Sequence, residues 1–388
     1  MPSAFADPSQ IPAQWAPPYL LYLGNARDDL AAKTARGLAF WRPEWCVGQR
    51  RGSRCAATLG LPDLDFVEAR VMGARTMIVG VANAGGVMDE ETVADVIAAL
   101  DAGMNVASGL HERLGAHPLV VAAAQRNGRH LFDARNPPAL AVGTGVPRAG
   151  RRLLTVGTDC SVGKMYTTLA IERELRGRGV KADFRATGQT GIFIAGAGVP
   201  VDAVVADFIS GSVEWISPAR NDDGWDLIEG QGSLFHASFA GVSLGLLHGA
   251  QPDALVLCHE PGRANMRGLA HYPLPRLETC LEANLQAARL TNPDVVAVVT
   301  PVTRECRACL RGNRRPAGLA LPGSGDHGRG PHRRPAAGGL RPLSRLQHAP
   351  DCAERLQSST LCRRSKKRPP WSNACWNWTP YKPWPSVA

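Results

Sequence analysis

The chain lacks any apolar run long enough to cross a bilayer. Its longest runs, such as 254–258 and 295–299, are far shorter than the roughly 20 residues that a membrane-spanning helix needs. The proline-rich N-terminus has no basic start followed by an apolar segment, so we expect no signal peptide. The 388 residues are 44% hydrophobic and 20% charged, which is typical of a globular protein with two or three domains. Five scattered cysteines before residue 300 favour reduced thiols and a cytoplasmic enzyme.

The net charge of +10 is concentrated in the last part of the chain. Residues 1–300 carry 27 Lys and Arg against 30 Asp and Glu, whereas residues 301–388 carry 17 against 4. Basic proteins that bind DNA usually present their positive charge on a folded face. Because the body is mildly acidic, we do not expect nucleic acid as a partner, and the lack of apolar runs argues against a membrane.

Residues 301–388 differ in composition from the body. They hold 12 of the 30 prolines, four of the nine tryptophans and five of the ten cysteines, without sustained helical or strand periodicity. One interpretation is a disordered basic arm, and a second is a zinc module on Cys306 and Cys309, although the later ligands lack paired spacing. The third, which we favour because the change is abrupt, is a frameshifted end. We therefore expect an aberrant basic tail.

Residues 17–145 alternate short strands with helices, a pattern that predicts a parallel, Rossmann-like sheet. The expected strands are 19–23, 75–81, 105–108 and 130–133, and the expected helices are 28–41, 89–103 and 118–127. No G-x-G-x-x-G motif follows the first strand, so NAD binding is not supported. Ligands of such sheets bind at the carboxyl ends of strands, where Asn83, Ser108 and His111 lie.

The most specific motif lies after a Gly- and Pro-rich linker at 142–150. An expected strand at 152–156 is followed by Gly-Thr-Asp-Cys-Ser-Val-Gly-Lys at 157–164 and an expected helix at 165–178. This is the P-loop arrangement, in which backbone N–H groups and the helix N-terminus surround a phosphate and the lysine adds a charge. Met165 replaces the Ser or Thr that normally holds Mg²⁺, which favours phosphate binding without effective Mg²⁺ binding.

Four further segments are expected to be strands of the same sheet, which gives five strands with polar, glycine-rich ends. They are 181–185, followed by Thr187 and Gln189; 204–211, with Asp207; 225–232, with Glu229 and Gln231 and then His236; and 254–258, followed by His259, Glu260 and Arg263. An acid at the end of an apolar strand is the usual partner of a P-loop, so these residues are expected to gather beside it.

These motifs carry a resemblance to known families. The 157–164 loop with Glu-Gly-Gln-Gly at 229–232 resembles the P-loop class of dethiobiotin synthetase. With Val-Ala-Asn-Ala-Gly-Gly at 81–86, Ala-Ser-Gly-Leu-His at 107–111 and Cys-His-Glu-Pro at 258–261, the body resembles the D-glutamate N-acetyltransferase family. The resemblance implies a Rossmann-like domain at 17–145, a P-loop domain at 151–300, and acetyl transfer from acetyl-CoA to D-glutamate during D-glutamate breakdown. It also implies a homo-oligomer.

The implied chemistry assigns roles to the candidate residues. An acceptor ammonium must lose a proton before attack, and Glu229 is the first choice of base, with Asp159, Asp207 and His236 behind it. Lys164 and loop N–H groups are expected to stabilise the oxyanion. The cofactor-binding set is Gly157, Thr158, Asp159, Cys160, Ser161, Val162, Gly163, Lys164 and Met165. The substrate-binding set is Arg185, Thr187, Gln189, Asp207, Gln231, His259, Glu260, Arg263, Asn83, Ser108 and His111.

Within these sets, Arg185 and Arg263 suit the two substrate carboxylates. No metal is expected. One alternative is an ATP- and Mg²⁺-dependent ligase or kinase of the dethiobiotin synthetase type. The other is a nucleotide-binding regulatory module.

Overall fold

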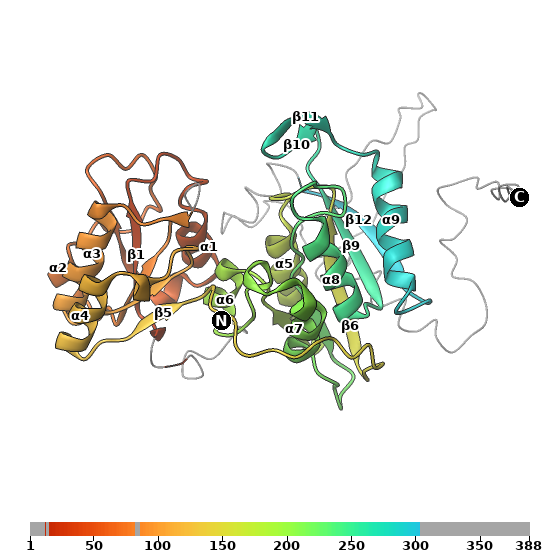
Figure 1. Cartoon of the computed structure of the whole chain (residues 1–388), viewed down its shortest axis with the longest axis horizontal. Helices are drawn as coiled ribbons and strands as arrows, with labels where there is room; N and C mark the ends of the chain where they lie inside the picture. The colour runs from red at the N-terminus through yellow and green to blue at the C-terminus, as the bar shows by residue number, and fades with distance from the viewer. Residues whose placement is uncertain (1–11, 13–14, 82–85, 303–388) are drawn as a thin grey trace, which may run out of the picture. The chain divides into compact units, whose positions relative to one another are not determined.

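The computed structural model describes residues 12, 15–81 and 86–302, which contain two five-stranded sheets within one compact unit (Figure 1). Both sheets are parallel throughout. The first has the order β2 (Cys46–Arg51), β1 (Tyr19–Gly24), β3 (Thr76–Val79), β4 (Asn105–Ser108), β5 (Leu131–Asp133). The second has the order β12 (Val296–Pro301), β9 (Ala254–His259), β6 (Arg151–Gly157), β8 (Trp225–Ile228), β7 (Ala182–Arg185).

The first sheet buries both faces because alternate residues of β1 point to opposite sides. Its helices are α1 (Lys33–Trp41), α2 (Phe66–Val71), α3 (Glu90–Asp101) and α4 (Pro118–Asn127). Leu20 and Tyr22 pack with α2, α3 and α4, whereas Leu21 and Leu23 pack on the other face with α1 (Figure 1). The Rossmann-like arrangement expected from the sequence is therefore confirmed.

Most of the expected elements in this half are present, with two differences. The helix expected from Asp28 begins at Lys33, because the Asp28 carboxylate accepts a hydrogen bond from Ala31 N at 2.7 Å and holds a turn. Strand β2 and helix α2 were not expected, since the Cys-Val-Gly-Gln-Arg-Arg sequence of β2 has neither an apolar run nor clear alternation.

The second sheet confirms the P-loop arrangement, with β6 at its centre and α5 directly after the loop. Its helices are α5 (Lys164–Gly177), α6 (Gln189–Ala195), α7 (Ile209–Ile216), α8 (Ala240–Ala250) and α9 (Leu277–Arg289). A short hairpin is formed by β10 (Asn265–Met266) and β11 (Leu269–Pro273). Helices α7, α8 and α9 pack on one face of the sheet, and residues of α5 and α6 join the cluster that contains α1.

The strand expected over 204–211 is wrong. This segment forms a 3₁₀ turn, Ala206–Phe208, and the start of α7. Ile209, Val213 and Ile216 are buried at helical spacing, so the apolar pattern has a helical period rather than that of a strand. The fifth strand of the sheet is instead β12, which pairs with β9 at the edge.

Helix α1 of the first sheet packs directly against helix α6 of the second. The Thr34 and Thr190 hydroxyls form a buried hydrogen bond of 3.0 Å, and Arg42 Nε donates to the Ile194 carbonyl at 3.0 Å. A Cβ at Gly37 would lie 2.7 Å from Thr190 Cγ2, so this close approach requires glycine. The two sheets therefore share a continuous core.

None of the helices in the described part of the chain has the length and apolar character of a membrane span. Residues 303–388, with Cys306 and Cys309, lie outside the described residues. The interpretations of the tail stay predictions.

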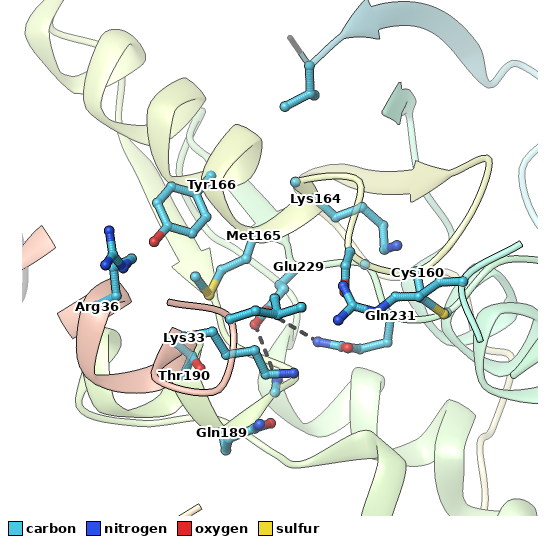
Figure 2. Close-up of a pocket in the computed structure, with 18 of the residues that line it drawn as sticks. Lys33, Arg36, Cys160, Lys164, Met165, Tyr166, Gln189, Thr190, Glu229 and Gln231 are labelled. Carbon is cyan, nitrogen blue, oxygen red and sulfur yellow. Dashed lines mark hydrogen bonds between the residues drawn. The ribbon is translucent and has the colours of Figure 1, made fainter. Parts of the chain in front are cut away.

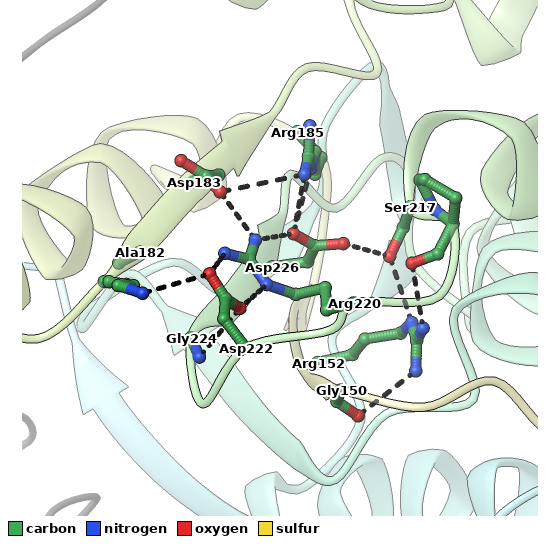
Figure 3. A network of polar contacts seen from close by, with 12 residues as sticks. Gly150, Arg152, Ala182, Asp183, Arg185, Ser217, Arg220, Asp222, Gly224 and Asp226 are labelled. Atoms are coloured by element: carbon green, nitrogen blue, oxygen red, sulfur yellow. Dashed lines mark hydrogen bonds and ion pairs between the residues drawn. The ribbon is translucent and has the colours of Figure 1, made fainter.

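A buried network of charges lies at the end of the second sheet where β8 begins (Figure 3). Asp226 is completely buried and accepts hydrogen bonds from Arg185 at 2.8 Å, Arg220 at 2.6 Å and Ser217 at 2.6 Å. Ser217 also accepts a hydrogen bond from the buried Arg152 at 3.0 Å. Asp226 is therefore the buried carboxylate of a network in which Asp183 and Asp222 also pair with these arginines.

We predict that Asp226→Ala lowers the free energy of unfolding by about 3–5 kcal/mol, because it removes the buried carboxylate that pairs with Arg185 and Arg220 and accepts the hydrogen bond of Ser217. Urea denaturation monitored by circular dichroism measures the change. Asp222→Ala is the matched control, since Asp222 is paired with Arg220 on the surface side of the same network and its loss should have a much smaller effect. Equal stability of Asp226→Ala and the wild type would contradict the assigned role.

Candidate active site

A cavity of about 970 Å³ opens where the P-loop, the 188–190 segment and helix α1 meet (Figure 2). The second sheet contributes Lys164, Glu229 and Gln231 to its lining. The first sheet contributes Lys33 and Arg36 from α1. This volume lies at the upper end of the range of about 300–1,000 Å³ that is usual for small-molecule sites.

The P-loop has the backbone conformation that its glycine predicts. Gly163 adopts a φ of +94°, and a Cβ there would lie 2.8 Å from Val302 Cγ1, so both conformation and space require glycine. Ser161 also has a positive φ, of 55°. Cys160, Ser161, Gly163, Lys164 and Met165 line the cavity, so five of the nine predicted cofactor-binding residues reach it.

Lys164, the first residue of α5, is buried beneath its own loop. Its Nζ donates a hydrogen bond of 2.9 Å to the Asp159 carbonyl. Burial lowers the pKa of the Lys164 ammonium, and the nearby Asp159 and Glu229 carboxylates act in the opposite direction. The lysine is therefore placed where an anion in the loop would compensate its charge.

Glu229 follows β8 and is held mainly by the backbone of the neighbouring strand end. One of its oxygens accepts from Thr187 N at 3.0 Å and Gly188 N at 3.2 Å, and the other accepts from Gln231 Nε2 at 3.2 Å. Burial raises the pKa of Glu229 to about 7 despite these hydrogen bonds. A carboxyl with this pKa exchanges a proton readily near neutral pH, as a general base must.

Asp159 and His236 are both buried, and they hold the backbone of Arg267 in the β10–β11 turn. The Asp159 carboxylate accepts from Arg267 N at 2.8 Å and from Arg263 Nη1 at 2.6 Å. His236 Nδ1 accepts from Ser238 N at 3.2 Å, so its Nε2 carries the proton and donates to the Arg267 carbonyl at 3.1 Å. These two residues therefore position Arg267, whose side chain lines the cavity.

The structure brings several other predicted residues to the edge of the site. Gln189 lines the cavity at the start of α6, and Thr187 lies beneath it, donating to the Glu229 carbonyl at 2.6 Å. His259 contacts the Thr158 hydroxyl at 3.2 Å, and burial lowers its pKa. Glu260 forms an ion pair with Arg263.

Other predicted residues do not line the cavity. Arg185 is engaged by Asp226, Asp207 is exposed in a 3₁₀ turn, and the Ser108 hydroxyl accepts from Leu110 N at 3.1 Å. His111 is exposed at the surface, but its ring is partly desolvated, and this desolvation together with the charges of Arg135 and Lys33 lowers its pKa. Gly157 and Val162 belong to the P-loop without lining the cavity, and Asn83 lies outside the described residues.

Five charged residues of the cavity were missed in the sequence: Asp29, Lys33, Arg36, Asp202 and Arg267. Lys33 and Arg36 belong to a helix whose partner, α6, is more than 150 residues away in the chain, so no local pattern marks them. Arg267 lies in a hairpin whose alternation is too short to recognise. The scarcity of lysine was the one sequence signal that could have drawn attention to Lys33, because residues 1–302 contain only Lys33, Lys164 and Lys181.

Asp159, Cys160 and His236 place possible metal ligands within 4.8 Å of one another. The group does not fit a metal ion, because the Arg263 guanidinium already neutralises Asp159 and both nitrogens of His236 form hydrogen bonds. We derive no metal chemistry from this cluster.

The chain is similar to two proteins named D-glutamate N-acetyltransferase over most of its length. It is 50% identical to a D-glutamate N-acetyltransferase of Pseudoalteromonas sp over 301 residues, which are 77% of this chain and 91% of that protein. It is 52% identical to a D-glutamate N-acetyltransferase of Tritonibacter scottomollicae over 71% of this chain and 84% of that protein. A crystal structure of a DUF1611 family protein from Anabaena variabilis ATCC 29413 matches with a TM-score of 0.66 and 30% identity, over 74% of this chain and 88% of that one.

Two family profiles cover the body of the chain. Residues 45–137 match the Rossmann-like domain DUF1611_N, and residues 141–308 match the P-loop domain DUF1611_C, both described as domains of unknown function. The first match contains β2, β3, β4 and β5 of the first sheet, and the second contains all five strands of the second sheet. The chain therefore belongs to the DUF1611 family, together with the two D-glutamate N-acetyltransferases that it resembles.

Proposed function

We propose that this protein is a D-glutamate N-acetyltransferase that transfers the acetyl group of acetyl-CoA to the amine of D-glutamate. The observation that carries the proposal is the 50% identity to the Pseudoalteromonas enzyme over 91% of that protein's length. The site supports it, because a phosphate-binding loop and a carboxyl with a pKa of about 7 line one cavity.

Glu229 is the general base. Its ionised carboxylate removes a proton from the substrate ammonium, and the freed nitrogen lone pair attacks the carbonyl carbon of the acetyl thioester. The C–N bond forms as the C=O π bond opens to an oxyanion, which the N–H groups of the loops and Lys164 stabilise. Collapse of the intermediate breaks the C–S bond, and the departing thiolate of CoA takes the proton held by Glu229. The nitrogen releases its second proton to solvent as the neutral amide forms. N-acetyl-D-glutamate and CoA are the products.

The P-loop binds phosphate groups of acetyl-CoA. CoA carries a pyrophosphate and a 3′-phosphate, and the start of α5 offers N–H groups and the Lys164 charge to one of them. Acyl transfer leaves these phosphates intact, so the reaction needs no hydroxyl to hold Mg²⁺, and Met165 at that position is compatible with it. The same substitution disfavours the ATP-dependent alternative.

Direct transfer is favoured over an acetylated cysteine. Cys160 lines the cavity, but burial raises the pKa of its thiol. The nearby His236 has both nitrogens in hydrogen bonds with the backbone, so it is not free to remove the thiol proton. The reactive thiolate of a covalent mechanism is therefore disfavoured at neutral pH.

Three broader features are part of the proposal. The five described cysteines have free thiols, which supports a cytoplasmic location. The domain boundaries at 17–145 and 151–300 are supported by strands that span 19–133 and 151–301. A homo-oligomer stays a prediction.

We predict that the purified protein releases thiol from acetyl-CoA only when D-glutamate is present. EDTA should leave the rate within about twofold, because acyl transfer by this route requires no metal. The measurement is thiol release, with phosphate release from ATP and Mg²⁺ followed in parallel. ATP-dependent phosphate release with no acetyl transfer would favour the ligase or kinase alternative.

We predict that Glu229→Gln lowers kcat/KM by about 10²- to 10⁴-fold, because the amide cannot accept the ammonium proton. In the wild type, kcat/KM should rise as the pH increases through about 7, where Glu229 loses its proton, and this rise should be absent from the variant. Glu174→Gln is the control, since Glu174 lies on α5 in an ion pair with Arg178 outside the cavity. An unchanged pH profile in Glu229→Gln would exclude Glu229 as the base.

We predict that Lys164→Ala raises the KM for acetyl-CoA by about 10- to 100-fold, since a hydrogen bond to a charged group contributes about 1.5–3 kcal/mol. Lys181→Ala is the control, because Lys181 is exposed and lies near Asp222. Steady-state kinetics with acetyl-CoA varied at saturating D-glutamate measure the effect. An unchanged KM would contradict phosphate binding by the P-loop lysine.

A further inference from the structure

The proposed acceptor has more negative charge than the residues predicted for it can bind. D-Glutamate carries two carboxylates at neutral pH, one beside the ammonium and one at the end of its side chain. Arg185 and Arg263, the arginines expected to bind them, are paired with Asp226 and Asp159. Another cation of the cavity must therefore recognise the acceptor.

The cavity contains four cationic side chains: Lys33, Arg36, Lys164 and Arg267. Arg36 is engaged by the Asp29 carboxylate and by the Thr58 carbonyl. Lys164 belongs to the P-loop, and Arg267 is held against the P-loop residue Asp159 through its backbone. Lys164 is therefore on the side assigned to acetyl-CoA. Arg267 and Lys33 are the remaining cations, their charges act on each other, and Lys33 is the one that the first sheet supplies.

Within the residues that the structure describes, the Lys33 ammonium has no hydrogen-bond or ion-pair partner. Its charged neighbours are Arg267, Arg135 and Asp202, and Asp202 is itself paired with Arg135. Burial and the two arginines lower the pKa of Lys33. The side chain nevertheless keeps substantial solvent exposure. A carboxylate bound here would relieve an existing repulsion between cations.

The positive charge of Lys33 lies at the N-terminus of α1, where it does not stabilise the helix. Lys33 is the first residue of α1, the N-cap Ala32 provides no side-chain cap, and the first turn holds no acid. A cation at a helix N-terminus opposes the helix dipole, which favours negative charge there. The positive end of the helix and the ammonium thus both favour an anion at this point of the cavity.

Helix packing places Lys33 across from the general base. Thr34, the next residue, is hydrogen-bonded to Thr190 of α6, and Gly188 just before α6 donates to Glu229. Figure 2 shows the Lys33 side chain extending from α1 into the cavity, toward the side that holds Glu229 and Gln189. Lys33 and Glu229 do not form an ion pair, so a substrate can lie between them.

On the basis of the function proposed above, we propose that Lys33 binds the side-chain carboxylate of D-glutamate while the amine lies at Glu229. The side-chain carboxylate is the farther of the two from the amine, which suits a cation supplied by the opposite sheet. Lys33 would then determine the preference for an acidic acceptor. The first sheet would supply specificity, and the second would supply the base and the cofactor loop.

The test compares D-glutamate with D-glutamine, in which a neutral amide of nearly the same shape replaces the side-chain carboxylate. In Lys33→Met, kcat/KM for D-glutamate should fall by about 10- to 100-fold, chiefly through KM, while that for D-glutamine should change by less than about threefold. Lys33→Arg should retain most of the preference. Lys181→Met is the matched control, and circular dichroism checks that each variant is folded. Equal losses for both acceptors, or no loss, would overturn the assignment.

Binding provides a readout that does not depend on turnover. Isothermal titration should show that the wild type prefers D-glutamate to D-glutamine and that Lys33→Met does not. An active wild type with an unchanged preference in Lys33→Met overturns this inference and leaves the proposed function standing. A wild type that binds D-glutamate selectively without acetylating it overturns the proposed function alone. A wild type with no preference in either measurement overturns the inference.

Discussion

Close packing of helix α1 on helix α6 brings the two halves of the site together. The contact depends on the absence of a side chain at Gly37 and on a buried hydrogen bond between Thr34 and Thr190. Lys33 is the residue before Thr34 on α1. Gly188, whose N–H donates a hydrogen bond to Glu229, lies just before α6. A displacement of either helix would therefore separate the cation from the base, although neither residue takes part in the packing itself.

Charge compensation decides which arginines remain for ligands. Asp226 and Asp159 have no exposed surface, so each is stable as a carboxylate only with a cationic partner. Asp226 forms ion pairs with Arg185 and Arg220, and Asp159 forms one with Arg263. Arginines at strand ends thus have structural roles here, and the cations that line the cavity come from a helix start and a hairpin turn.

The sequence was sufficient for the parallel sheets, the P-loop and the place of Glu229, because each rests on a local pattern. A short apolar strand, a glycine-bounded loop and a following helix are all contained within about 30 consecutive residues. The same local reasoning failed for 204–211, where valine and isoleucine favoured a strand but burial follows a helical period. It also gave no indication of the hydrogen bonds by which Asp159 and His236 hold Arg267, because these join distant segments.

Long-range contacts explain the remaining omissions. Lys33 reaches the P-loop cavity only because α1 and α6, separated by more than 150 residues, are neighbours in space. Nothing in the residues around Lys33 encodes that neighbour.

The way in which Glu229 is held has a consequence for the evolution of the site. Two of its three hydrogen bonds come from main-chain N–H groups of Thr187 and Gly188, and those donors persist through most side-chain changes at these positions. The residues of α1 that line the cavity come from the first sheet, whereas the buried residues of α1 belong to the core that the two sheets share. Selection, or a protein engineer, is therefore free to vary the α1 face and explore new amines while the proton-transfer apparatus stays intact.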